Sequence, residues 1–524
     1  MIVRLGLMVV ILGLCWRVGR FLMGFPMWGD EAFIVANLYT RDFAGMVQPL
    51  EHQQIAPLGF MWVELAAARV LGMSVWALRT PAFVCGLFSL LVFWRFARRR
   101  LDPYSGLLAV AIFAASYYVV RHSSEVKPYA GDLAVSLVLT CLGWAVYCRS
   151  DSIARWLGLI IVAAAGVWLS YPAVFVAGAV AMLLTALLWQ QRSRKVFSGW
   201  IAYVLIFGGS FLVMYVLYGK PHSEAAQDMV ASNTWNRSFP PLAQPWRLPL
   251  WFLKVHTGNM LAYPVGGKNF GSIFTFLLVV TGIADLWRNR RGPLLLLLLG
   301  PLVLMMVAAA MEKYPYGTSA RVSQHMAPAF CLLAGVGLSS ALRVLLKGRG
   351  LMRGLYAATT VMAAIAVVVL VTDIARPWKK FSDRANLEAM RVLAGWTAAG
   401  DQWVIFNAIE TVPYAPDIHL WGGSAARFRY YVRRFGPANV RWAPPVGDVL
   451  RQDAERIWLI VYRDNKNPFP QELLEPYLER MQQQLGQPRR HWFKLTSAKD
   501  PPRSHVEAIE VYEFPVLGPS SSDT

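Results

Sequence analysis

Apolar runs of about 17–25 residues recur from the N-terminus to about residue 374, and they constrain the fold of this 524-residue chain more than any other feature. Each run is long enough to cross the roughly 30 Å hydrocarbon core of a membrane as a helix. They lie near 5–25, 80–97, 104–120, 130–148, 154–169, 172–189, 199–218, 271–287, 293–310, 326–346 and 353–374. They predict a polytopic α-helical membrane protein with about 11 spans, in which 1–375 is the transmembrane domain.

The net charge of +20 is spread over short connections between these runs. Alternate loops hold Arg95/Arg98/Arg99/Arg100, Arg149/Arg155, Arg192/Arg194/Lys195, Arg288/Arg290/Arg291 and Lys347/Arg349/Arg353. All five basic loops fall on one side, which the positive-inside rule makes cytoplasmic. We therefore expect a multi-pass protein of the cytoplasmic (inner) membrane with a cytoplasmic N-terminus and no nucleic acid partner.

The stretch 57–72 is apolar enough to suggest a further span. Counting it as a crossing would move every basic loop outside, and Glu64 and Arg69 would be costly at the bilayer centre. We expect 57–72, and 31–47 before it, to form amphipathic helices along the outer interface, so that the external loop 26–79 is structured.

The residues after 375 have a different composition, with charged and proline-bearing stretches between short apolar segments. Candidate strands are 403–406, 457–462 and 506–512, and helical patterns lie near 383–397 and 471–485. This alternation predicts an extracytoplasmic soluble α/β domain over 376–516. The tail 517–524 is expected to be disordered.

Under this topology the unusual polar segments gather on the outer side. They include Asp30-Glu31, Glu51-His52, the cluster 121–132 and the stretch from Glu312 to His325. This convergence predicts an active site that faces away from the cytoplasm. Phosphate-binding glycine loops and dinucleotide fingerprints are missing from the sequence, so nucleotide-driven chemistry is not supported.

Structural roles remain open for the same residues. Asp30 and Glu31 stand where they would also stabilise the N-terminus of a helix beginning near Ala32. Glu125 would also serve as an ion-pair partner of Arg121 or Lys127 at a membrane-end loop.

The order of these motifs resembles the GT-C superfamily of integral-membrane glycosyltransferases, in the bacterial branch related to protein O-mannosyltransferases and the lipid A aminoarabinose transferase. Asp30-Glu31 follows the first span, Ala77-Leu78-Arg79-Thr80-Pro81 precedes the second, and Lys313-Tyr314-Pro315-Tyr316-Gly317 with Arg321 resembles the late external loop of that family. The resemblance covers about 1–375. The chain departs from the aminoarabinose transferases around 50–57, where their Glu-Lys-Pro spacing is absent.

The resemblance implies inverting transfer of a sugar from a polyprenyl-phosphate donor to an envelope acceptor on the outer face of the membrane. Asp30 matches the catalytic carboxylate as general base, and Glu31 would assist it or bind a divalent ion. The implied substrate-binding residues are Glu125, Lys127, Tyr129, Lys313, Tyr316 and Arg321, and the candidate metal ligands are Glu51 and His52.

The main alternative is a secondary transporter or flippase of lipid-linked sugars. Such proteins carry internal repeats and ionisable groups at the bilayer midplane. The central thirds of these spans are almost free of charge and the two halves show no repeat, which favours the enzyme.

Overall fold

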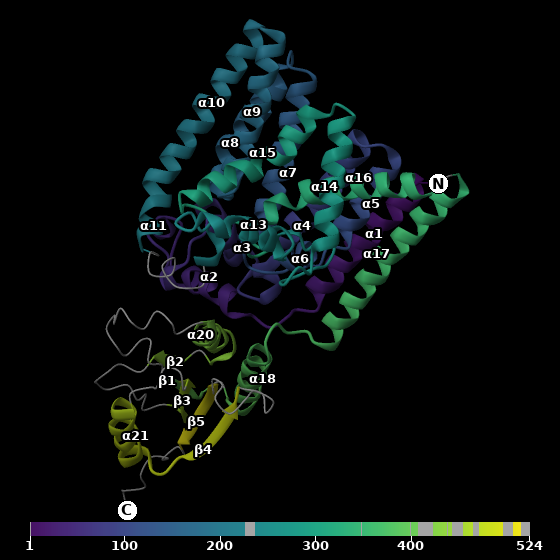
Figure 1. Cartoon of the computed structure of the whole chain (residues 1–524). Helices are drawn as coiled ribbons and strands as arrows, with labels where there is room; N and C mark the ends of the chain where they lie inside the picture. The colour runs from purple at the N-terminus through teal and green to yellow at the C-terminus, as the bar shows by residue number, and fades with distance from the viewer. Residues whose placement is uncertain are drawn as a thin grey trace, which may run out of the picture. The chain divides into compact units, whose positions relative to one another are not determined.

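The computed structural model describes residues 2–225, 236–346, 348–398, 400–406, 423–437, 439–442, 454–464, 471–495 and 507–514. The chain forms two compact units (Figure 1). The membrane unit comprises Met1–Gly24, Arg41–Gly72 and Trp76–Ala375, and the second unit comprises Phe25–Thr40, Met73–Val75 and Arg376–Thr524. The predicted tail 517–524 lies outside the described residues.

The membrane unit is a bundle of helices (Figure 1). Its helices are α1 (Ile2–Leu22), α3 (Leu58–Leu71), α4 (Val75–Arg100), α5 (Pro103–Ala114), α6 (Tyr117–His122), α7 (Tyr129–Cys148), α8 (Ile153–Leu169), α9 (Ala173–Gln191), α10 (Arg194–Met214), α11 (Lys220–Ala225), α13 (Leu248–His256), α14 (Ile273–Arg288), α15 (Gly292–Ala310), α16 (Ala327–Leu345) and α17 (Arg349–Ala375). Within the described part, eight helices are long and apolar enough to cross a membrane.

The runs predicted as spans are helical, although 104–120 is divided between α5 and α6. Three of the helices are shorter than the eight, because α5 has 12 residues, α8 has 17 and α14 has 16. The chain is therefore a multi-pass helical membrane protein, as the sequence predicts.

Small residues bring α16 close to two neighbouring helices. A Cβ atom on Gly335 would lie 2.4 Å from the backbone nitrogen of Ala109 in α5. A Cβ on Gly337 would lie 1.9 Å from the carbonyl oxygen of Leu278 in α14. Glycine lets helix backbones approach this closely, so these positions set how α16 sits in the bundle.

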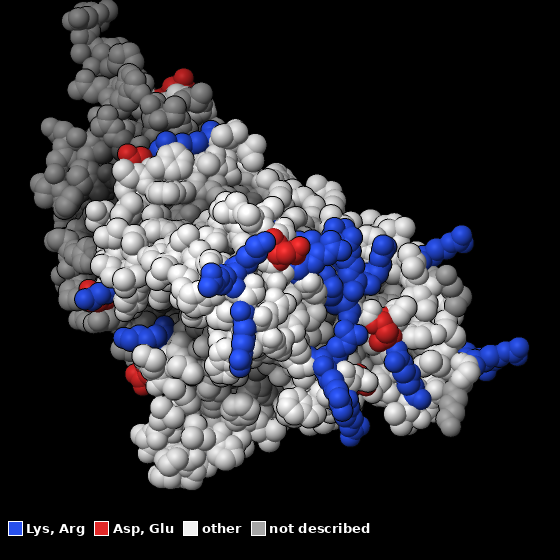
Figure 2. Space-filling view, turned by 90° about the horizontal axis from the view of Figure 1, so that it is seen from above, with Lys and Arg blue, Asp and Glu red and all other residues white. Residues whose placement is uncertain are grey.

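The basic loops share one end of the membrane unit. Arg100 after α4 lies 3.9 Å from Cys148 Sγ at the end of α7. Ser150 Oγ donates to Gln191 Oε1 at the end of α9 (2.9 Å), and Arg343 near the end of α16 pairs with Asp102. Figure 2 shows Lys and Arg side chains gathered over one face with few acids among them. The predicted grouping of basic loops therefore agrees with these contacts.

The second unit is built on a five-stranded mixed sheet of order β2-β1-β3-β5-β4. The strands are β1 (Gln402–Phe406), β2 (Asn439–Trp442), β3 (Ile457–Asp464), β4 (Arg489–Lys494) and β5 (Glu507–Phe514). β1 pairs in parallel with β2 and β3, whereas β5 is antiparallel to β3 and β4. The helices are α2 (Gly29–Thr40), α18 (Phe381–Trp396), α20 (Gly423–Phe435) and α21 (Gln471–Leu485).

The central strands are buried on both faces, with every residue of β1 buried, as expected when helices cover both faces of a sheet. Val404, Leu459 and Val461 pack with Leu474 and Met481 of α21. The predicted strands and helices of this domain are present, with ends shifted by a few residues, while α20, β2 and β4 were not predicted.

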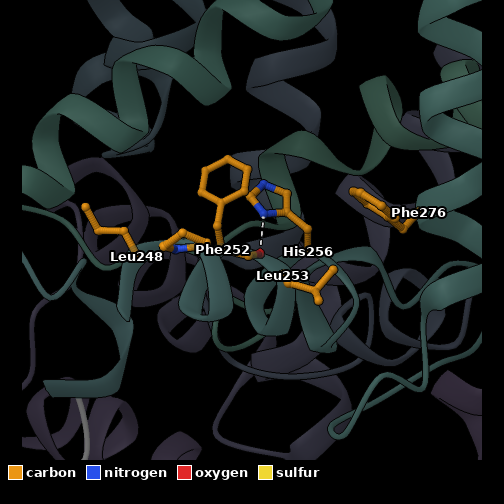
Figure 3. Close-up of a pocket in the computed structure, with 6 residues that line it drawn as sticks. Leu248, Phe252, Leu253, His256 and Phe276 are labelled. Atoms are coloured by element: carbon orange, nitrogen blue, oxygen red, sulfur yellow. Dashed lines mark hydrogen bonds between the residues drawn. The ribbon is translucent and has the colours of Figure 1, made fainter. Parts of the chain in front are cut away.

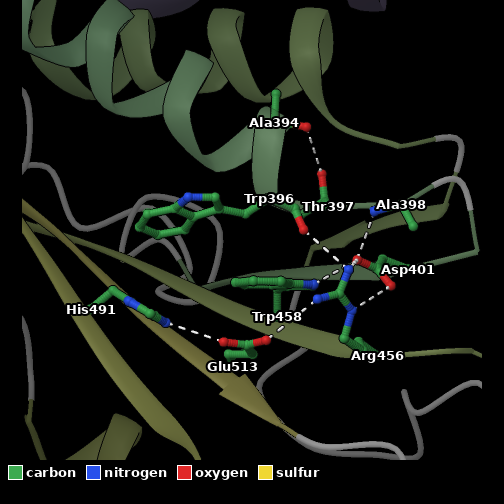
Figure 4. A network of polar contacts seen from close by, with 9 residues as sticks. All are labelled: Ala394, Trp396, Thr397, Ala398, Asp401, Arg456, Trp458, His491 and Glu513. Carbon is green, nitrogen blue, oxygen red and sulfur yellow. Dashed lines mark hydrogen bonds and ion pairs between the residues drawn. The ribbon is translucent and has the colours of Figure 1, made fainter.

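A polar network ties the end of α18 to the sheet (Figure 4). The fully buried Asp401 accepts from Ala398 N–H and Trp458 Nε1, both at 2.9 Å, and pairs with Arg456. Arg456 also pairs with Glu513, which binds His491 at 3.2 Å. Because Asp401 accepts from the loop after α18 and from β3, this network ties that loop to the sheet.

The two predicted interfacial segments are helical. α3 covers 58–71, and α2 covers 29–40 before the chain turns into a short 3₁₀ segment, Gly45–Val47. Their position along the membrane surface stays a prediction.

Candidate active site

The candidate residues divide between the two units. Asp30 and Glu31 belong to the second unit, and all the other candidates belong to the membrane unit.

In the membrane unit, a polar cluster surrounds the end of α6. Arg121 Nε donates to Glu125 Oε1 at 2.6 Å, and both side chains are largely buried. His122 Nδ1 donates to Gln324 Oε1 at 3.2 Å, just before α16. The ring of Tyr129, at the start of α7, lies 4.9 Å from that of His122. The cluster therefore joins the ends of three helices.

Electrostatics extend this cluster to Arg321. Burial lowers the pKa of His122 to about 4, with Arg121 and Arg321 lowering it further and Glu125 opposing them. The imidazole is therefore neutral at pH 7. Burial also lowers the pKa of Arg121, but Glu125 outweighs it and the pKa stays above its usual value, so Arg121 is charged. Arg321 is half-buried.

Lys127 is a second buried cation of this region. Its side chain is 7% exposed, and Nζ donates to the neutral amide oxygen Oε1 of Gln54 at 3.0 Å. A buried ammonium is costly unless it meets anions or strong acceptors, so Lys127 is held in a polar environment.

Two further candidates, Lys313 and Tyr316, differ from this cluster in their surroundings. Lys313 is exposed. Tyr316 is buried, and its hydroxyl donates to His256 Nε2 at 3.1 Å. Tyr316 thus supports α13 through a hydrogen bond.

The contact of Tyr316 with His256 lies beside an apolar pocket of about 430 Å³ (Figure 3). Leu248, Pro249, Phe252, Leu253, His256 and Phe276 line it. His256 Nδ1 donates to the carbonyl oxygen of Phe252 at 2.8 Å. The pocket is therefore hydrophobic and is lined by residues of α13 and α14.

Glu51 and His52 lie in the 3₁₀ turn Glu51–Gln53, where His52 has a left-handed backbone with φ of 58°. Three or more His, Cys, Asp or Glu side chains arranged to hold a metal ion are not found among the described residues. Glu51 and His52 thus lack a third protein ligand of these types in that part of the chain. The donor set does not by itself fit a metal centre, and we derive no step through a metal.

In the second unit, Asp30 and Glu31 form the first turn of α2. Glu31 is fully buried, and its Oε2 accepts from the backbone N–H of Trp28 at 3.2 Å. Glu31 therefore has the helix-capping role that the sequence left open. Asp30 is half-buried in the same turn.

The sequence did not single out Gln54 or Gln324 as site residues. Both are neutral, and the signal available was only their place within two to three residues of His52 and Arg321. Their role as partners of Lys127 and His122 depends on long-range contacts that spacing does not reveal.

Comparison with known proteins gives two findings. Residues 56–218 match the family described as dolichyl-phosphate-mannose-protein mannosyltransferase. The fold is similar to the crystal structure of ArnT from Cupriavidus metallidurans in the apo state, with a TM-score of 0.54 and 10% identity over 96% of this chain and 97% of that chain. The same protein bound to undecaprenyl phosphate matches with a TM-score of 0.52 and 13% identity over 97% of each chain. No curated protein matches this chain.

At this identity the structures share a fold, while the family match covers residues 56–218, less than a third of the chain. The fold and the family match over 56–218 therefore agree with the resemblance predicted from the sequence.

Proposed function

We propose that this protein transfers a sugar from a polyprenyl-phosphate donor to an envelope acceptor on the outer face of the cytoplasmic membrane, with inversion at the anomeric carbon. The observation that carries the proposal is the fold, which this chain shares with ArnT, together with the buried cation Lys127 in the membrane unit. ArnT itself is known in complex with undecaprenyl phosphate, which supports a lipid phosphate as the ligand.

The proposed reaction balances as a single displacement. The acceptor hydroxyl attacks the anomeric carbon while Asp30 takes its proton. The bond between that carbon and the phosphate oxygen breaks, and the electron pair leaves with the polyprenyl phosphate. Lys127 and Arg321 stabilise the charge on the leaving phosphate, and Arg321 offers a bidentate contact.

The other candidates have supporting roles in this proposal. Arg121 and Glu125 neutralise each other, so their pair holds the end of α6 in place beside the phosphate. Tyr129 packs on His122 at the start of α7. Lys313 is exposed and would meet the head group from solvent.

Native mass spectrometry with undecaprenyl phosphate tests the donor site. We expect Lys127→Met and Arg321→Ala to weaken binding by about tenfold or more, and Arg321→Lys to recover part of the loss. Lys268→Met, which removes an exposed lysine of the long external loop, is the matched control. Equal affinities in the wild type and both charge-removing variants would rule out this phosphate site.

A second assay separates transfer from transport. The protein is reconstituted in closed vesicles, because only a closed membrane can report movement of a lipid between leaflets. The vesicles contain radiolabelled undecaprenyl-phosphate hexoses and pentoses, and envelope membranes are added as acceptor. The proposal expects label to move into acceptor material. Movement of the labelled lipid between leaflets without transfer would support a flippase instead.

A further inference from the structure

The segment that carries Asp30 folds with the C-terminal domain. Phe25–Thr40 belongs to the same compact unit as Arg376–Thr524, and α2 packs against α20. The orientation of the acidic turn is therefore set by contacts within this unit.

A buried tyrosine of α20 holds the backbone just before the turn. The N–H of Met27 donates to the hydroxyl oxygen of Tyr431 at 2.9 Å, and both residues are fully buried. Met27 lies three residues before Asp30. On the other side, the N–H groups of Glu31 and Ala32 donate to the carbonyl oxygen of Trp28 at 3.0 Å. The turn is thus fixed by α20 at one end and by its own helix at the other.

The helix that carries Tyr431 is itself anchored to the domain. Arg427 of α20 forms a buried ion pair with Asp383 of α18. The ring of Phe428 lies 5.4 Å from that of Tyr462 on β3. Buried, paired charges and packed rings keep a helix in one position. α20 is therefore anchored to α18 and to β3.

A second contact reaches the same turn from the start of the C-terminal domain. The ammonium of Lys379 lies over the ring of Trp28. Lys379 is exposed, so its contribution is smaller than that of Tyr431.

We propose that α20 is the support that positions the general base, with the Tyr431 hydroxyl as the positioning group for Asp30. This inference rests on the proposed function, because it takes Asp30 as the base. Tyr431 acts through the Met27 backbone and does not contact the reacting atoms. Its loss leaves a buried N–H without its acceptor and loosens the turn, and small errors in the position of a base slow proton transfer strongly.

Tyr431→Phe is the direct test, because it removes one oxygen and keeps the ring. We expect kcat to fall by about tenfold, with the KM for the polyprenyl-phosphate donor unchanged. The matched control is Tyr430→Phe on the same helix. Tyr430 donates to the carbonyl oxygen of Met73 at 3.1 Å instead of to the acidic turn, so a positioning role for Tyr431 predicts a much smaller effect on kcat.

Two further variants make the result decisive. Lys379→Met loosens the same turn from the surface and should lower kcat by about two- to threefold even if Tyr431→Phe folds poorly. Adding Tyr431→Phe to Asp30→Asn should cause no further loss, because the positioned group is already gone.

Wild-type kcat in both Tyr431→Phe and Lys379→Met would overturn the inference. An equal loss in Tyr430→Phe would also overturn it, since that pattern reports general destabilisation of α20. If Asp30→Asn alone is fully active, the assignment of the base fails, and that failure is visible without any α20 variant.

Discussion

At the scale of single residues, the structure separates two acids that stand side by side in the sequence. Glu31 is buried and accepts a hydrogen bond from its own helix terminus, whereas Asp30 is half-buried in the same turn. A side chain used for capping is less available for proton transfer. The chemistry is therefore expected to depend on Asp30.

Asp30→Asn should lower kcat by about 100-fold or more, because the amide is nearly the same shape but does not take up a proton. Glu31→Gln should stay near the wild-type rate, because the amide oxygen still accepts from Trp28 N–H. The rates are measured by transfer of labelled sugar, with thermal melting to verify folding. Comparable losses in the two variants would contradict the division of roles.

His122 gives the membrane unit a predicted acid sensitivity. Its folded pKa of about 4 lies below the usual 6.5 because the ring is buried. Below pH 6.5 the unfolded chain binds a proton that the folded chain does not, so this group's contribution to the free energy of unfolding decreases as pH falls from about 6.5 to 4. It is fully present above 6.5.

Thermal midpoints at pH 7 and pH 5 check this expectation. The wild type should lose more stability between these values than His122→Gln, which keeps a polar side chain beside Gln324 but does not titrate. Parallel losses in the two proteins would show that other groups cause the acid sensitivity.

At the scale of elements, close helix packing determines where the polar cluster lies. Gln324 comes just before α16, and Gly337 lets this helix lie against α14. An added Cβ would meet the Leu278 carbonyl oxygen, which belongs to backbone and cannot move aside like a side chain.

Gly337→Ala should therefore destabilise the bundle by about 1–3 kcal/mol and lower the thermal midpoint. Gly209→Ala in α10 is the matched control, because a Cβ there meets nothing within 4 Å and alanine favours the helix. A midpoint for Gly337→Ala at or above that of Gly209→Ala would mean that α16 and α14 are not packed this closely.

Some of these helices and strands could be predicted from the sequence and others could not. Long apolar runs identified the membrane helices because hydropathy alone selects them. The strand β4 was missed because its sequence, RRHWFK, is largely polar and its side chains are mostly exposed or half-buried at the edge of the sheet. The helix α20 carries four arginines, which hide the buried face formed by Phe428, Tyr431 and Val432.

At the scale of the whole molecule, the sequence suggests two consecutive parts, but the compact units interleave. The stretch Phe25–Thr40 follows the first membrane helix and yet folds with the C-terminal domain. Hydropathy does not reveal this, because the partners Met27 and Tyr431 are 404 positions apart. The candidate base was found from its motif, while its surroundings depend on that long-range contact.

The orientation of the membrane unit is the last prediction. The loops joined by the contacts of Arg100 with Cys148 and of Ser150 with Gln191 carry basic residues, and the positive-inside rule assigns their side to the cytoplasm.

In a variant without the native cysteines, Asn289→Cys marks the basic loop between α14 and α15, and Ala243→Cys marks the long loop before α13. Both positions are exposed. A membrane-impermeant maleimide is applied to intact spheroplasts, whose outer membrane has been removed. It should label Ala243→Cys alone, and Asn289→Cys should react only after the cytoplasmic membrane is permeabilised. Labelling of both from outside, or of Asn289→Cys alone, would reverse or break the predicted topology and with it the outward-facing site.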